Sequence, residues 1–176
     1  VSAKGQVLGI NLWLPQEGNL VWPGSPQITA AAAFFIDTGT GQVLYAKNIH
    51  QRLPIASLVK TMTVLVALEN KKMNDVYTVS GQATQAVPDK MFLIAGEKLT
   101  LKELLAGIFL VSGNDAAETI AEGTTGNRSE FITLMNKKAL QLDMKDSFFV
   151  NPSGLDEDTT NSYSSAYDLA VLTRYL

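Results

Sequence analysis

One stretch of the chain is apolar almost all the way round. From Ser57 to Glu69 most positions beyond Lys60 carry apolar side chains, and they leave no polar face at helical spacing. Pro54 cannot continue a helix backwards and serine is favoured at a helix start, so the pattern predicts a helix that begins near Ser57. Because a helix without a polar face is normally buried, we expect it to run through the middle of the fold.

The other patterns predict a mixture of helices and strands. Two apolar runs, residues 30–37 and 42–47, flank a Gly-rich link and predict a β-hairpin. Thr100 followed by Glu103 predicts the capping box of an amphipathic helix that runs to about Val111. The remaining predicted elements, in chain order, are a strand at 76–79, a loop at 80–98, helices at 115–122 and 129–142, strand-like chain at 148–155 with a turn at 152–154, and a helix at 165–176.

The chain divides into a lead-in and one domain. Residues 1–29 are rich in proline and glycine, which predicts extended or irregular chain, and Trp13 and Trp22 are expected to cover an edge of the core. Residues 30–176 are long enough to bury a core of their own. The apolar runs at 30–36 and 104–111 are far too short to span a bilayer. The chain starts with Val1 instead of Met, so we expect a trimmed or processed sequence.

Composition excludes several chemistries. The net charge of −3 and the absence of long basic runs give no nucleic-acid surface. With no cysteine there are no disulfides, thiol nucleophiles or Cys-ligated metals. The single histidine, His50, lies in a polar stretch and is expected in an exposed loop, so we expect no metal site and no cofactor. A nucleophilic mechanism would then have to use Ser, Thr or Lys, with Lys, Asp, Glu or Tyr as the base.

Ser57 and Lys60 are unusual residues at the entrance of a buried helix. They lie three apart and therefore share a face. Desolvation lowers the pKa of a lysine, and a neutral amine beside a hydroxyl is a base beside a nucleophile. The bland alternative is a serine N-cap with a lysine that extends to the surface. Chance alone supplies about 0.7 Ser-x-x-Lys matches in a chain of this composition, so the motif by itself is weak.

Ser112-Gly113-Asn114 interrupts the next two predicted helices. Its side chains can project from the bend, although Ser, Gly and Asn are also ordinary turn residues. Asp115, Glu118 and Glu122 follow at helical spacing and are expected to form a solvated face.

Together these segments resemble the serine D-alanyl-D-alanine carboxypeptidases, the low-molecular-mass penicillin-binding proteins of the β-lactamase/DD-peptidase superfamily. The similarity covers about residues 30–175, and order and spacing also agree. The segments that carry it are Asp37–Leu44, Pro54–Thr63, Gly96–Leu105, Ser112–Ala117, Asn151–Leu155 and Tyr163–Ala170. Asp143 stands where the family usually has a glycine after a helix, which implies some strain there.

The resemblance implies a role for four residues. Ser57 would attack the carbonyl of a D-Ala-D-Ala peptide and form an acyl-enzyme, and Lys60 would take its proton. Ser112 would relay a proton to the leaving amine, while Asn114 would hydrogen-bond the substrate amide and help to place Lys60. The backbone N–H of Ser57 would supply half of an oxyanion hole. β-Lactams would trap the same serine.

The resemblance also implies an α+β fold of the β-lactamase/DD-peptidase type, with a helical region packed on an antiparallel sheet. The family's third motif, Lys-Thr-Gly, is missing from the chain, so residues 30–176 are expected to be a partial domain with an incomplete sheet. We therefore expect little turnover by these residues alone, and self-association or a need for a missing C-terminal part. The implied substrate is the peptidoglycan pentapeptide, in an extracytoplasmic location, with any membrane anchor outside this chain.

Two alternatives stay open at this point. A β-lactamase or a related Ser-x-x-Lys esterase would share the first motif, although Asp156-Glu157-Asp158 does not match the acidic loop of a class A β-lactamase. A non-catalytic peptidoglycan-binding module could retain the fold without the chemistry. The preference for carboxypeptidase, transpeptidase or endopeptidase products is also left open.

Overall fold

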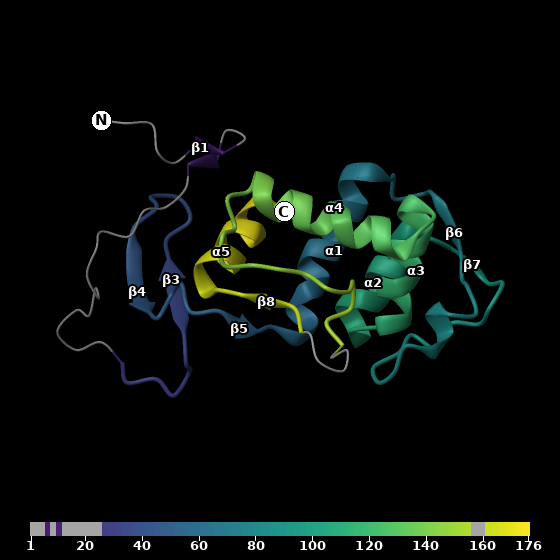
Figure 1. The fold of residues 1–176 in the computed structure, drawn as a ribbon, viewed down its shortest axis with the longest axis horizontal. Coiled ribbons are helices and arrows are strands. Elements are labelled where there is room, and N and C mark those ends of the chain that lie inside the picture. The colour runs from purple at the N-terminus through teal and green to yellow at the C-terminus, as the bar shows by residue number, and fades with distance from the viewer. Residues whose placement is uncertain (1–5, 8–9, 12–25, 156–160) are drawn as a thin grey trace. The chain divides into compact units, whose positions relative to one another are not determined.

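The computed structural model describes residues 6–7, 10–11, 26–155 and 161–176 (Figure 1). Most of the predicted lead-in, with Trp13 and Trp22, lies outside the described residues. The chain forms two compact units. The first comprises Val1–Leu53, Ala139–Ser147 and Tyr163–Leu176, and the second comprises Pro54–Lys138 and Phe148–Ser162.

The first unit contains the predicted β-hairpin. Strands β3 (Ala33–Ile36) and β4 (Val43–Lys47) pair antiparallel. The connecting turn is held by Asp37, whose Oδ1 accepts hydrogen bonds from the backbone N–H and the hydroxyl of Thr40. Helix α5 (Ala166–Tyr175) contacts β3. Two further strands of this unit, β1 (Gln6–Val7) and β2 (Ile10–Asn11), form a short antiparallel pair.

The second unit is built around the apolar helix. A single 3₁₀ turn, η1 (Ala56–Leu58), leads into α1 (Val59–Asn70), and most of α1 is buried as predicted. Helix α3 (Asn114–Thr125) contacts both α1 and α2 (Leu101–Val111) (Figure 1). Thr100 caps α2 with the predicted capping box, because its side chain accepts from Glu103 N while the Glu103 carboxylate accepts from Thr100 N.

A second hairpin in the same unit was only half predicted. Strand β6 (Val76–Thr78) was expected, but its partner β7 (Lys98–Thr100) falls where the pattern suggested a loop and a helix cap. The apolar content of β7 is too low to stand out, and only its pairing with β6 defines it as a strand. The remaining elements are η2 (Ala83–Gln85), α4 (Arg128–Gln141), and the paired strands β5 (Leu53–Pro54) and β8 (Tyr163–Ser164).

The structure is therefore of the predicted α+β class, with small antiparallel sheets. The strand-like prediction for residues 148–155 is wrong apart from a single bridge at Phe148, because this segment turns to place its polar groups against side chains of Asn136 and Asn151. Asp143 adopts the expected left-handed conformation, with φ of 57°. No helix in the described ranges has both the length and the apolar character needed to cross a membrane.

Candidate active site

Ser57 lies in the 3₁₀ turn immediately before α1, in an exposed position. The preceding residue, Ala56, has φ of 43°, a left-handed conformation that is uncommon for a residue with a side chain. Gly154 packs directly against this strained residue, since a Cβ built on Gly154 would lie 1.9 Å from the carbonyl oxygen of Ala56. The segment around Gly154 thus braces the backbone that carries Ser57.

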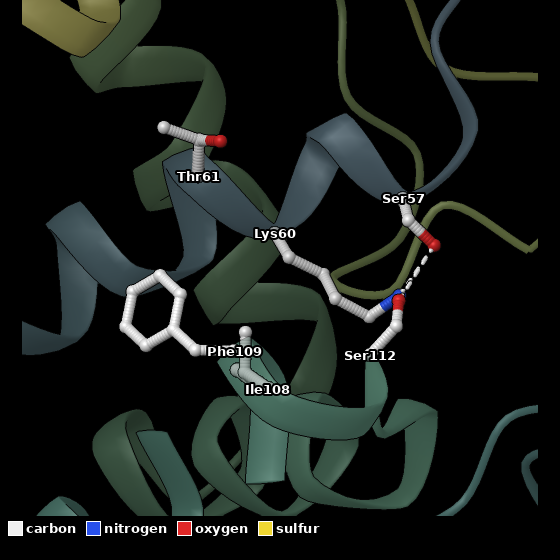
Figure 2. Close-up of a pocket in the computed structure, with 6 residues that line it drawn as sticks. All are labelled: Ser57, Lys60, Thr61, Ile108, Phe109 and Ser112. Atoms are coloured by element: carbon white, nitrogen blue, oxygen red, sulfur yellow. Dashed lines mark hydrogen bonds between the residues drawn. The ribbon is translucent and has the colours of Figure 1, made fainter. Parts of the chain in front are cut away.

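Lys60 occupies the first turn of α1 and is only 4% exposed. Its Nζ donates hydrogen bonds to the hydroxyl oxygens of Ser57 at 2.9 Å and Ser112 at 3.3 Å (Figure 2). A third bond of 2.8 Å goes to the backbone carbonyl of Ser153. The Ser112 hydroxyl also donates to Ser57 Oγ over 3.1 Å. Three acceptors match the three protons of an ammonium group, so this is a resting arrangement with Lys60 charged.

The charge of Lys60 results from two opposing effects. Burial lowers the pKa of Lys60 and the charge of Asp89 raises it by less, so that the pKa falls to about 8. With a pKa of about 8, roughly one tenth of the lysine is neutral at pH 7. The shift has the direction expected from the sequence: burial lowers the pKa of Lys60 and brings the neutral amine within reach.

Ser112 ends α2 and stands at the junction with α3. It has φ of 55° at the C-cap of α2, and Gly113 serves as the N-cap residue of α3. The left-handed turn lets the Ser112 side chain leave the helix and reach Ser57 and Lys60. The segment is therefore a turn between two helices, and the same turn brings Ser112 beside Ser57 and Lys60; its part in catalysis stays a prediction.

Asn114 is the first residue of α3 and is buried. Its Nδ2 donates to the carbonyl of Pro88 at 2.8 Å, and its Oδ1 is buried without a hydrogen-bond partner. The acceptors of Lys60 are the oxygens of three serines instead. Lys60 and Asn114 share no hydrogen bond here, and the expected help of Asn114 in placing Lys60 stays a prediction.

The prediction of a solvated face at Asp115 and Glu118 is wrong. Asp115 is fully buried, and its two carboxylate oxygens accept from the backbone N–H groups of Met91 at 2.8 Å and Leu93 at 3.0 Å. Glu118 is also buried and forms an ion pair of 2.8 Å with Arg128. Each buried carboxylate thus has the donors that make its burial tolerable.

Ser153 belongs to the candidate site by its contacts, and sequence reasoning did not single it out. Its carbonyl accepts from Lys60, and its hydroxyl lies 3.4 Å from a carboxylate oxygen of Glu118. Asn151 fixes this turn, because its Oδ1 accepts from the backbone N–H groups of Ser153 at 3.2 Å and Gly154 at 2.6 Å. The segment carries part of the family resemblance, but every residue has a backbone carbonyl, so the residue type could not predict this contact with Lys60.

These groups open onto a pocket of about 270 Å³ (Figure 2). Figure 2 shows Phe109 and Ile108 on the side opposite Ser57, so the reactive groups face an apolar wall. His50 is exposed, as predicted, and interacts with Asp146 at 3.1 Å. Across the part of the chain that the structure covers, no group of three or more His, Asp or Glu side chains could hold a metal ion. The pocket is lined by Ser57, Lys60, Thr61, Ile108, Phe109 and Ser112.

The fold and the serine–lysine arrangement define a class of proteins, and comparison with known sequences shows which family of that class the chain resembles. Residues 20–176 match the family model of D-alanyl-D-alanine carboxypeptidases of the peptidase S11 type. The D-alanyl-D-alanine carboxypeptidase DacF of Bacillus subtilis is 43% identical over 152 residues, which is 84% of this chain and 39% of that protein. The chain therefore belongs to the D-alanyl-D-alanine carboxypeptidase family.

Solved structures agree in fold. The D-alanyl-D-alanine carboxypeptidase DacD from Francisella tularensis superimposes with a TM-score of 0.82 at 33% identity, over 92% of this chain and 40% of that one. Penicillin-binding protein D2 from Listeria monocytogenes, in its ampicillin-bound form, gives a TM-score of 0.71 at 28% identity, over 85% of this chain and 63% of that one. The chain thus spans about two fifths of the length of the curated relative and the first of these structures.

Proposed function

We propose that the protein is a serine D-alanyl-D-alanine carboxypeptidase that acts on peptidoglycan stem peptides through an acyl-enzyme on Ser57. The observation that carries the proposal is the 2.9 Å contact between Lys60 Nζ and Ser57 Oγ in a member of this family. The pocket beside Ser57 and the buried base are what an acyl transfer requires. The named relatives favour this interpretation over a β-lactamase or a binding module.

The proposed reaction begins when Lys60 is neutral. Its amine takes the proton of Ser57, whose oxygen attacks the carbonyl carbon between the two D-alanines and forms the new ester bond. The C–N bond to the terminal D-alanine breaks as a proton passes through Ser112 to the leaving amine. Water then hydrolyses the ester and frees Ser57. Ser57 N–H, at the positive end of α1, would stabilise the developing oxyanion.

Asn114 keeps a proposed role in binding substrate. Among the residues that the structure describes, Asn114 Oδ1 is the one buried side-chain oxygen or nitrogen that has no hydrogen-bond partner. A substrate amide N–H would satisfy this acceptor once the side chain turns toward the pocket, which Asn114 does not line in this structure. We also propose that β-lactams acylate Ser57, as ampicillin binding by the Listeria protein suggests, and that the enzyme works outside the cytoplasm, where peptidoglycan is found.

The proposal is tested in the protein as its gene encodes it, including any sequence beyond Leu176. The protein is incubated with a labelled penicillin, the adduct is located by mass spectrometry, and D-alanine release from a pentapeptide is measured. We expect a stable adduct on Ser57 and its loss in Ser57→Ala, while Ser129→Ala, on the exposed start of α4, is labelled normally. Rapid penicillin hydrolysis without an adduct would instead indicate a β-lactamase, and no adduct at all would indicate a binding module.

A further inference from the structure

The turn at residues 151–154 presents two successive backbone carbonyls to one face of α1. Lys60 donates to the carbonyl of Ser153 at 2.8 Å, and the hydroxyl of Thr63 donates to the carbonyl of Pro152 at 2.7 Å. Lys60 and Thr63 lie three positions apart on α1, so they share a face of the helix. The two side chains therefore hold neighbouring peptide groups of the same turn.

Thr63 is fully buried, and apart from Lys60 the other buried residues of α1 are apolar. A helical threonine commonly donates its hydroxyl to a carbonyl of the preceding turn of its own helix, as Thr119 does to Asp115 in α3 at 2.8 Å. The Thr63 hydroxyl instead reaches across to Pro152. Because this bond is buried, removal of the hydroxyl would leave its partner without a ready replacement from water.

The same turn is fixed from two further directions. Within the turn, Asn151 Oδ1 accepts from the backbone N–H groups of Ser153 at 3.2 Å and Gly154 at 2.6 Å. On the side of α3, the Ser153 hydroxyl donates to Glu118 at 3.4 Å. These bonds set the shape of the turn and its distance from α3, whereas the Thr63 bond sets its position along α1, the helix from which Lys60 extends.

The Ser153 carbonyl differs in kind from the other two partners of Lys60. A backbone carbonyl can only accept a hydrogen bond, whereas the hydroxyls of Ser57 and Ser112 can also donate. Neutral Lys60 would have two N–H groups and one lone pair. With one N–H directed to the carbonyl, the second N–H and the lone pair are left for the two hydroxyls, which lie 2.9 and 3.3 Å from Nζ (Figure 2). Displacement of the carbonyl would let the amine turn its lone pair away from Ser57.

We infer that Thr63 is a positioning residue: its hydroxyl holds the turn that carries the Ser153 carbonyl, and that carbonyl directs the Lys60 amine at Ser57. The inference rests on the proposed function, in which neutral Lys60 takes the proton of Ser57. A threonine that only filled the core would contribute to stability, and its replacement would not slow the chemical step separately.

The test compares the intact protein with its Thr63→Val variant, which keeps the branched shape and removes the hydroxyl. Stopped-flow measurement with a fluorescent penicillin separates the acylation rate constant at saturation from the dissociation constant of the first complex. In Thr63→Val we expect the rate constant to fall about 10-fold or more and the dissociation constant to stay within about twofold of the parent's, because only the aim of Lys60 changes. Thr63→Ser, which retains the hydroxyl, should recover most of the rate. A serine variant as slow as Thr63→Val would overturn the inference.

Thr119→Val is the matched control. Thr119 is 1% exposed and its hydroxyl also donates to a carbonyl, but within α3. Both valine variants should lose a similar free energy of unfolding, measured by urea denaturation, whereas Thr119→Val should acylate like the parent. A rate constant that falls equally in both variants, or that stays at the parent's value in Thr63→Val, would overturn the inference. If Thr63→Val does not fold, Thr63→Ala and Thr119→Ala take the place of the pair.

The positioning of Lys60 is also testable without acylation. In NMR spectra of the protein with ¹³C-labelled lysine, Lys60→Met identifies the signals of the Lys60 ε-methylene. A side chain held by the Ser153 carbonyl gives two distinct ε-proton shifts, which we expect to merge in Thr63→Val and to stay distinct in Thr119→Val. Unchanged shifts in Thr63→Val would overturn the inference, whereas the absence of a Ser57 adduct in the parent would overturn the proposed function alone.

Discussion

Lys60 combines a buried position with contacts that favour its charged form. Its Nζ is the donor in three hydrogen bonds, to Ser57, Ser112 and Ser153. In this state Ser57 Oγ is an acceptor, and it cannot give its proton to Lys60 because the ammonium group has no free lone pair to accept one. Burial lowers the pKa of Lys60 to about 8, so the reactive state becomes accessible with a modest rise in pH.

The acylation rate should follow the deprotonation of Lys60. Below the pKa of about 8, each pH unit raises the neutral fraction about tenfold, so the rate should increase with pH and level off above the pKa. Lys60→Met should reduce acylation by penicillin about 10²- to 10⁴-fold and remove this inflection. Stopped-flow or gel-based labelling over a pH series measures both effects. Lys72→Met, an exposed control, should behave like the parent, and a pH-independent parent rate would contradict the lysine-base mechanism.

Gly154 should not tolerate a side chain. An added Cβ would lie 1.9 Å from the carbonyl oxygen of Ala56, so Gly154→Ala should displace Ser57, lower the free energy of unfolding by about 3 kcal/mol and reduce acylation by more than about tenfold. Gly126→Ala is a matched control, since Gly126 also has positive φ, at 78°, but open space around its Cβ.

The two glycine variants separate strain from collision. Gly126→Ala should cost only the backbone strain of about 1 kcal/mol and leave acylation unchanged. Urea unfolding and penicillin labelling are measured on both proteins. Equal losses of stability and of acylation in both variants would show that the close approach of Gly154 to Ala56 does not affect acylation.

At the scale of elements, the start of α3 holds the neighbouring loop in place, although its sequence pattern predicted a solvated face there. Asp115 holds the loop at Met91 and Leu93, and its Oδ1 also accepts from Ala116 N at 2.9 Å. One buried carboxylate therefore fixes the loop and the first turn of α3 together. The same loop carries Asp89, whose charge opposes the effect of burial on the pKa of Lys60.

Removal of the Asp115 carboxylate should be costly. Asp115→Ala leaves three backbone donors without their partner in a buried region, and we expect the free energy of unfolding to fall by about 2–4 kcal/mol. Asp75→Ala removes a carboxylate that accepts a single exposed bond, from Lys72 N, and should cost about 1 kcal/mol or less. Chemical denaturation measures the free energy of unfolding of both variants. If Asp115→Ala loses no more than Asp75→Ala, the Asp115 carboxylate does not hold the loop to α3.

At the scale of the whole molecule, the lysine that we propose as the base works against stability. Folding lowers the pKa of Lys60 from 10.5 to about 8, so between these values the unfolded state binds more protons. The free energy of unfolding should therefore rise with pH from about 8 to about 10.5. Above this window Lys60 is neutral in both states, and the gain in stability is complete. Below pH 8 the folded state carries the whole cost of a buried charge.

The comparison with Lys60→Met isolates this effect. Other groups titrate equally in both proteins, so the difference in free energy of unfolding, parent minus variant, should increase with pH across the window. Thermal or urea unfolding in a pH series measures the difference. A flat difference from about pH 8 to about 10.5 would contradict a lowered pKa for Lys60 in the folded protein.

The sequence by itself determined the features that depend on neighbours along the chain. The apolar pattern of α1, the capping box of Thr100 with Glu103, and the hairpin around residues 38–41 are local, and each was predicted correctly. The Ser57–Lys60 pairing is local too, because helical spacing brings residues three apart together. The family resemblance added Ser112, and the structure brings it to the same place.

Only the tertiary structure decided what lies across from these residues. Lys60 donates to the carbonyl of Ser153, 93 positions away in the sequence. The backbone N–H groups that donate to the Asp115 carboxylate are 22 and 24 positions away. The sequence pattern of a carboxylate at helical spacing is the same whether it faces water or backbone donors, so burial of Asp115 could not be predicted. The proton affinity of Lys60 likewise depends on burial and on Asp89, because electrostatic energy follows distance and dielectric surroundings, which no residue order specifies.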